Sequence, residues 1–304
     1  MREVCNLLKR NMLVFLRDRA AVFFSVLSML IVLGLMVVFL GNMSTQGVVN
    51  ILAEIGGERD TLTDQKNAEY LIQMWTLAGI LAVNSLTVAM TVMGNMIQDE
   101  TQNRLASFYV APIRRIQLAF GYVGSSFLIT SGMCVITLFV GEVYMTICGH
   151  PMLALLDILK LIVMIMLNAF IYASISYLLA MVIHSESAWS GILTIVGTLV
   201  GFAGAIYLPM SSLPNSVASV LKCLPVLHGA SMMRGICTKD AVTATFAGLP
   251  SEVTDAFNDG MGVTVSMGGE VVSIQRQITF LLACGIIAIV AAALISRRRK
   301  VRDR

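Results

Sequence analysis

The sequence has little charge, few histidines and no nucleotide-binding loop, and these absences exclude several classes of protein. Charged residues make up 13% of the 304-residue chain, against roughly a quarter in soluble domains. No glycine is followed by lysine, which excludes the GxxxxGKS and GxxxxGKT loops that cradle the phosphates of ATP. The HExxH, CxxC and GxSxG patterns are also missing. A net charge of +3 is too small to indicate a nucleic-acid partner. We therefore expect a membrane protein that is not an enzyme by itself.

The chain has instead six long apolar segments, none of which contains Asp, Glu, Lys, Arg or His. A helix of about 20 apolar residues crosses the roughly 30 Å hydrocarbon core of a bilayer. The segments are Ala20–Gly41, Leu71–Ile97, Leu118–Gly141, Leu161–Ile183, Ala188–Leu208 and Ile278–Ile295. We expect an all-α polytopic membrane protein with six transmembrane helices, forming a single domain over residues 1–304.

The charges in the expected loops predict the orientation in the membrane. With the N-terminus inside, the inner pieces are 1–19, 98–117, 184–187 and 296–304, and they hold 14 of the 21 lysines and arginines. The outer pieces hold 12 of the 18 acidic residues. Because basic residues favour the cytoplasmic side, we expect a plasma-membrane protein with both termini in the cytoplasm.

Two of the inner pieces have amphipathic patterns. The first predicts an interfacial helix, with basic residues along one face and apolar residues along another, and the alternative is an ordinary charged flank. In the second, Leu105, Phe108 and Tyr109 share one helical face, and Pro112 ends that helix. This face either docks into a groove on a partner or lies on the lipid interface.

The second inner piece resembles the cytoplasmic coupling region of ABC-2-type transporter permeases. That family shows an acidic residue, a leucine, a proline and basic residues, followed by a helix-opening leucine and glycine. The matching residues are Glu100, Leu105, Pro112, Arg114, Arg115, Leu118 and Gly121. A second family pattern follows the fifth segment, and its residues are Pro209, Pro214, Pro225 and Arg234. The resemblance covers essentially the whole chain.

The resemblance implies the membrane subunit of an ABC exporter. The chain would bind no cofactor, and ATP and Mg would belong to a separate cytoplasmic ATPase, present in two copies. A second permease copy or a homologous permease would complete the complex in the lipid membrane. The residues expected to couple to the ATPase are Asp99, Glu100, Arg104, Leu105, Phe108, Tyr109, Pro112 and Arg114.

The uncharged segments also bear on the cargo. They favour an amphipathic or hydrophobic substrate, such as a drug, peptide, lipid or glycan, because ion-coupled carriers usually need ionisable groups at depth. An energy-independent channel or secondary carrier is the alternative, and a non-transporting membrane scaffold is another. None of these alternatives needs an ATPase partner.

Polar and small residues recur at helical spacing in the second and fifth segments. Such stripes either allow close helix packing or line a translocation path or dimer seam. The resemblance favours the path, because the family is thought to build it from these two helices. The expected path residues are Asn84, Thr87, Thr91, Asn95, Ser190, Thr194 and Thr198.

The outer piece 209–275 contains apolar stretches too short to span a bilayer, since Pro225 interrupts residues 215–236. We expect two short re-entrant helices here, which act either as an outer gate or as a packing plug; the gate residues would be Pro209, Pro214, Pro225 and Arg234.

Smaller features give further expectations outside the membrane core. Residues 262–272 alternate around Gly-Gly, which predicts a small hairpin. The acidic stretch 42–70 is expected to be a solvated loop or helix, and Asp157 is expected to pair with Lys160. The six cysteines have no metal-binding spacing, and a Cys223–Cys237 disulfide is topologically open.

Overall fold

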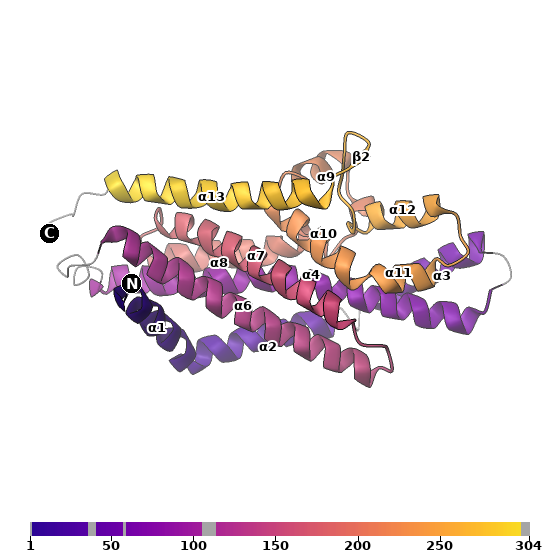
Figure 1. Ribbon diagram of the computed structural model, residues 1–304, viewed down its shortest axis with the longest axis horizontal. Coiled ribbons are helices and arrows are strands. Elements are labelled where there is room, and N and C mark those ends of the chain that lie inside the picture. The colour runs from indigo at the N-terminus through magenta and orange to yellow at the C-terminus, as the bar shows by residue number, and fades with distance from the viewer. Residues whose placement is uncertain (1, 36–40, 57–58, 105–113, 299–304) are drawn as a thin grey trace.

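The protein is an elongated bundle of helices whose two ends are built differently (Figure 1). We call the end at which α1 begins and α13 ends the inner end, after the predicted orientation, and the opposite end the outer end. The computed structural model describes residues 2–35, 41–56, 59–104 and 114–298. The elements are α1 (Arg2–Arg17), α2 (Arg19–Leu35), α3 (Gly41–Ile55), α4 (Thr61–Thr101), α6 (Arg115–Ile147), α7 (Leu155–Ala180), α8 (Glu186–Ala203), the 3₁₀ helix η2 (Met210–Ser212), α9 (Asn215–Leu221), α10 (Pro225–Cys237), α11 (Lys239–Thr245), α12 (Ser251–Gly260), β1 (Ser266–Met267), β2 (Glu270–Val271) and α13 (Ile274–Arg298).

Five of the described helices are long and apolar enough to cross a membrane: α4, α6, α7, α8 and α13. They correspond to five of the six apolar segments, so the expectation of an all-α polytopic membrane protein is confirmed. The first segment, Ala20–Gly41, coincides largely with α2, and residues 36–40 lie outside the described part. A sixth span therefore stays a prediction.

Helix α4 forms the centre of the bundle. In its most apolar stretch 83% of the residues are buried, against 17% in α8, and α4 packs against α6, α7, α8 and α10. It has 41 residues, which corresponds to about 60 Å at 1.5 Å per residue. The apolar segment Leu71–Ile97 is therefore only its middle, and α4 extends past a bilayer at both ends.

The long α4 corrects one expectation about the inner side. The inner piece is expected to begin at residue 98, after the second span, but Asp99, Glu100 and Thr101 form the last turn of α4. Asn103 follows with a φ of 57°, a left-handed conformation that asparagine tolerates and that commonly ends helices.

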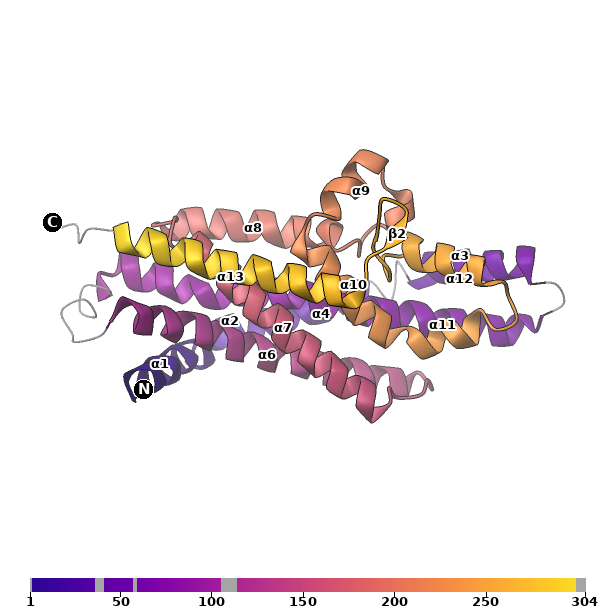
Figure 2. The ribbon, with the colours of Figure 1, turned by 45° about the horizontal axis from the view of Figure 1, so that its top comes forward.

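The outer ends of the helices carry a small helical unit. Helices α3, α11 and α12 pack with the outer part of α4, and they bury Val48, Leu52, Leu71 and Phe246 in a common core. Figure 2 shows these helices beyond the main bundle, away from both termini. The described parts of the acidic stretch 42–70 belong largely to α3 and α4, which is one of the two expected forms, a loop or a helix. Glu54 and Asp60 are exposed, whereas the apolar residues Val48 and Leu52 are buried.

One acidic residue of this stretch takes part in the contacts within the unit formed by α3, α11, α12 and the outer part of α4, which we call the outer unit. Asp64 is 7% exposed and forms an ion pair with Arg59 at 2.8 Å. Arg59 also donates to the carbonyls of Thr245 and Ala247 at 3.0 and 2.8 Å. The guanidinium therefore connects the start of α4 to the end of α11 and the turn after it.

Three of the smaller expectations have clear outcomes. The hairpin is confirmed, with Ser266 opposite Val271 and Gly268 and Gly269 at positive φ, as a tight turn requires. Lys160 pairs with Asp157 at 2.5 Å, also as expected. The Cys223–Cys237 disulfide is not formed, because all six cysteines belong to the described residues and each is free.

Candidate functional site

The inner end of α4 is joined to its neighbours by a cluster centred on Asp99. Arg10 of α1 donates to both oxygens of Asp99, with Nη1–Oδ2 and Nη2–Oδ1 distances of 2.5 and 2.6 Å. Tyr122 of α6 donates its hydroxyl to Oδ2 at 2.6 Å. Arg104 lies 3.7 Å from Oδ1. Such a bidentate, charge-assisted arrangement fixes geometry as well as adding energy, so α1, α4 and α6 meet at one buried carboxylate.

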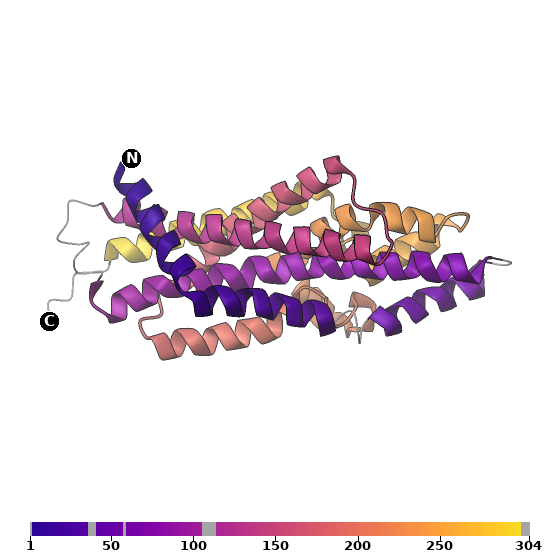
Figure 3. The ribbon, with the colours of Figure 1, turned by 90° about the horizontal axis from the view of Figure 1, so that it is seen from below.

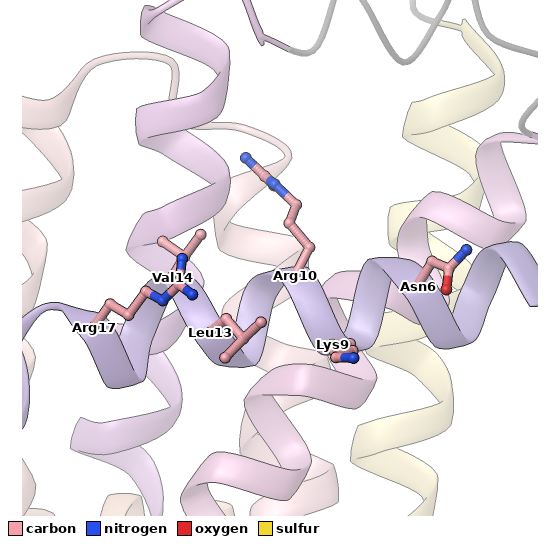
Figure 4. A pocket seen from close by; sticks show the side chains of 6 residues that line it. All are labelled: Asn6, Lys9, Arg10, Leu13, Val14 and Arg17. Atoms are coloured by element: carbon pink, nitrogen blue, oxygen red, sulfur yellow. The ribbon is translucent and has the colours of Figure 1, made fainter.

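The side chain of Arg10 differs from those of the basic residues Lys9 and Arg17 of its helix. A hollow of about 330 Å³ lies along α1, and Figure 4 shows Arg10 and Lys9 extending from different sides of the helix. The hydrogen bonds that Arg10 donates to Asp99 raise the pKa of the Arg10 guanidinium, and burial opposes this effect. Arg10 therefore serves the bundle, whereas Lys9 and Arg17 remain exposed on the surface of α1.

The inner end of α4 also contacts the connection that leads into α8. Glu100 Oε1 lies 3.2 Å from Nδ1 of His184, and Thr101 donates its hydroxyl to Glu186 Oε1 at 2.7 Å. Together with the Asp99 cluster, these contacts link the last turn of α4 to three other helices. Displacement of this turn must therefore move α1, α6 and the start of α8 with it.

The expected coupling residues divide into two groups. Leu105, Phe108, Tyr109 and Pro112 lie outside the described residues, so their placement stays a prediction. The other four flank that segment: Asp99 is buried, Glu100 is half-buried, and Arg104 and Arg114 are exposed. Since Asp99 is turned into the bundle, its side chain acts here as an internal link and not as a surface contact.

The expected path residues on α4 do not all share one environment. Asn84 is buried and donates to the Thr137 hydroxyl of α6 at 3.2 Å, so it faces a neighbouring helix. Thr87, Thr91 and Asn95 are half-buried. Figure 3 shows α4 running along the bundle, with α2 and α8 along the same part of it. Of the α4 stripe, these three residues remain available to line a path.

The path residues on α8 are exposed along one face. Ser190, Thr194 and Thr198 lie on the surface, and the two threonine hydroxyls donate to their own helix, at 2.9 Å to the carbonyls four residues earlier. A face of this kind presents small, self-satisfied polar groups. It suits either close contact with another helix or a weakly polar passage.

Two buried donors at the contact between α4 and α8 have no acceptor among the described residues. They are Nδ2 of Asn95 and Nε1 of Trp189, and a Cβ atom on Gly94 would lie 3.1 Å from that indole nitrogen. A buried donor without an acceptor costs free energy. A hydrogen-bond acceptor from another molecule would therefore stabilise this contact. Sequence reasoning marked Asn95 for the stripe, but the unpaired indole is visible only in three dimensions.

At the outer end, short elements follow prolines; we call the segment from Pro209 to Cys237, which contains η2, α9 and α10, the outer closure. Pro209 precedes η2, Pro214 precedes α9, and Pro225 opens α10, where its missing N–H is not needed. The helices α9 and α10 meet at a bend of 84°, so the expected pair of short helices is confirmed. Re-entry into the membrane and gating stay predictions.

Arg234 on α10 is the fully buried centre of this closure. Its guanidinium lies 4.5 Å above the ring of Trp75 on α4 and donates to the carbonyls of Ala205, at 2.9 Å, and of Met261 and Gly262, each at 3.3 Å. Trp75 donates to the same Met261 carbonyl at 2.8 Å. Arg234 therefore joins α10 to α4, to the break after α8 and to the outer unit.

The sequence does not reveal the partners of Asp99. Arg10 is one of the basic residues on the polar face of the predicted interfacial helix, and no sequence pattern marks Tyr122. Their pairing with Asp99 joins residues 89 and 23 positions apart, and no local pattern records it.

One comparison with known proteins identifies the family. A family model described as ABC-2 family transporter protein matches residues 53–294, from the end of α3 through most of α13. A search of curated proteins found no match. The matched range contains the five apolar helices, the inner end of α4 and the outer closure. The chain therefore belongs to the ABC-2 family of transporter proteins and is a multi-pass membrane permease.

Proposed function

We propose that this chain is the membrane subunit of an ATP-driven exporter. Two copies of a separate cytoplasmic ATPase, which hold ATP and Mg, supply the energy. A second copy of the permease, or a homologous one, completes the translocation path. The cargo is amphipathic or hydrophobic, and it moves outward across a plasma membrane in which both termini are cytoplasmic.

The single observation that carries this proposal is the continuous helix α4. Its last turn holds Arg10, Tyr122 and the start of α8, while its outer half packs under Arg234 and into the outer unit. An α-helix is stiff along its axis, so a displacement of one end of α4 moves the other end. This geometry supports coupling between a cytoplasmic motor and an outer closure.

The motor would act on residues 99–114. Within it Arg104 and Arg114 lie on the surface and Glu100 is half-buried, and the sequence places the apolar residues Leu105 and Phe108 between the two arginines. Docking of the ATPase here would move the last turn of α4, and the Asp99 cluster would transmit the movement to α1 and α6.

The path would form where α4 and α8 meet a second permease. Thr87, Thr91 and Asn95 on α4 and the exposed hydroxyl face of α8 would line it, and the unpaired indole N–H of Trp189 would offer a donor to cargo. The bent pair α9–α10, held by Arg234, would close its outer end.

The decisive experiment compares aspartate substitutions near the inner end of α4 with one near its outer end. Leu105→Asp and Phe108→Asp should abolish co-purification of an ATP-binding subunit from detergent-solubilised membranes, and with it ATP-dependent transport in vesicles. Leu62→Asp is the matched control, because Leu62 is 70% exposed at the outer end of α4. Equal retention of the ATPase by all three variants would refute this docking site. Transport by the isolated chain without any ATPase would refute the exporter.

A further inference from the structure

A groove outside the proposed path lies between α6 and α13, with α7 as its floor. Helix α7 packs against both neighbours, and Figure 1 shows α13 and α6 on opposite sides of it. The groove has a volume of about 540 Å³. Its walls are almost wholly apolar, and the side chains that matter most are Phe120, Phe127, Phe170, Tyr177 and Ala293.

The groove opens on a flank of the bundle that carries large exposed apolar side chains. Ile116 and Phe120 on α6 are 63% and 61% exposed, and Val290 and Leu294 on α13 are 52% and 55% exposed. Close contact between membrane helices favours small residues; large exposed side chains border this groove, whereas α8 exposes the small residues Ser190, Thr194 and Thr198. The groove therefore suits a flexible hydrocarbon chain better than a helix of a second subunit.

One end of the groove carries positive charge. Arg115 and Ser296 line that end, and Arg115 donates to the Ser296 carbonyl, which joins the first turn of α6 to the last turns of α13. Arg114 is exposed directly before Arg115, and α13 ends at Arg298. Arginine side chains recognise phosphate through several donors, and basic pockets between membrane helices on the cytoplasmic side bind anionic lipid headgroups.

We propose that this groove binds an anionic phospholipid of the inner leaflet, with an acyl chain between α6 and α13 and the phosphate at Arg114 and Arg115. The leaflet assignment rests on the proposed orientation. The bound lipid fills the space between α6 and α13 and holds these two helices at a fixed distance over α7. It is a different molecule from the cargo, because none of the expected path residues on α4 and α8 lines the groove.

The test measures which lipids the purified permease retains. The chain alone, without ATPase, is reconstituted into nanodiscs with equal amounts of phosphatidylglycerol and phosphatidylcholine, extracted in mild detergent and analysed by native mass spectrometry. We expect selective retention of phosphatidylglycerol. Arg115→Gln should lower this preference about fivefold, which is the scale of one arginine at a membrane surface. Ala293→Trp, which fills the groove, should abolish retention of both lipids.

The matched control is Ala283→Trp, since Ala283 lies on the same helix outside the groove and should retain lipid like the wild type. Equal retention of both lipids by the wild type would overturn the proposal, and so would full retention by Ala293→Trp. A change of oligomeric state in Ala293→Trp with lipid content unchanged would assign the groove to a second subunit instead. Because the nanodisc is symmetric and contains no ATPase, failure of the exporter proposal or of the orientation leaves this result unaffected.

Discussion

At the residue scale, two buried charges are satisfied in opposite ways. Asp99 is neutralised by Arg10 and by the Tyr122 hydroxyl, whereas Arg234 forms no ion pair with any described residue and is held by three carbonyls and the ring of Trp75. Asp99 lies at the inner end, beside the partly exposed side chain of Arg10. Arg234 lies wholly inside the outer closure, and its carbonyl partners come from two segments, Ala205 after α8 and Met261–Gly262 after α12.

The pair of Arg10 and Asp99 should show strong energetic coupling. Arg10→Gln and Asp99→Asn should each lower the thermal unfolding midpoint of the purified protein, and the double variant should lose less than the sum. The expected coupling is about 0.5–3 kcal/mol, the range for residues in one hydrogen-bonded network. Strictly additive losses would show that the two side chains contribute independently.

The indole N–H of Trp189 should matter more for transport than for stability. Trp189→Phe removes a buried donor that has no acceptor and retains most of the ring, so stability should stay equal or rise by about 1 kcal/mol. If the donor binds cargo, ATP-dependent uptake into inverted vesicles should fall while the ATPase remains bound. Unchanged uptake in a stable Trp189→Phe variant would remove this residue from the path.

At the scale of elements, α8 is the least embedded of the five long apolar helices. It lies against α4 at Trp189, next to Gly94. Its last turn is joined to the residues that follow it, because the Gly201 carbonyl accepts from the Ile206 N–H at 2.8 Å and Tyr207 covers the glycine, and Ile206 in turn lies against Gly79 of α4. Between these points its hydroxyl face is open. A helix held at its two ends can shift against α4 without breaking the core.

The anchoring at the end of α8 can be tested with two glycines of the same helix. In Gly201→Ala the new methyl would lie 2.2 Å from the Tyr207 ring, so the ring must move, at a cost of about 1–3 kcal/mol. Gly197→Ala meets nothing within 4 Å and should be neutral or stabilising by up to about 1 kcal/mol. Thermal unfolding of both variants measures the difference, and equal midpoints would contradict the packing described.

At the scale of the whole molecule, the two ends are built differently. The inner end gathers both termini and the basic residues of α1 and α13, and the outer end carries a helical unit with its own apolar core. The central helix α4 joins these ends, so the molecule is organised along one axis.

The native cysteines allow the orientation to be measured. Cys5 on α1 is exposed at the inner end, and Cys148, after α6, is exposed at the outer end. A membrane-impermeant maleimide added to intact cells should modify Cys148 and spare Cys5, which should react only after permeabilisation. Cys223 is exposed in the outer piece 209–275 and should be modified as well. Replacing both Cys148 and Cys223 by serine should remove the labelling from outside, and Cys5→Ser should leave it unchanged. The reverse pattern would place the termini outside.

Much of the helical architecture follows from composition along the chain. Five of the six apolar segments are long helices because an uncharged run of this length satisfies its backbone internally and has no favourable place in water. The hairpin at Gly268 and Gly269 and the pair of Asp157 and Lys160 are likewise local, since the residues involved are neighbours in sequence. The pattern around Glu100, Pro112 and Pro225 was sufficient to indicate the family that the comparison then identified.

The length of α4, the outer helical core and the two charge clusters were decided by tertiary structure alone. Thr61 and Thr101 lie outside the apolar run, and α4 extends to them because α3 and α11 cover its outer part and Arg10 and Tyr122 bind its last turn. Contacts such as Arg10 with Asp99, or Arg234 with Ala205, join segments that only folding brings together. The sequence determined which segments enter the membrane, because transfer from water depends on local composition; the fold determined which polar groups meet, because that depends on the packing of distant helices.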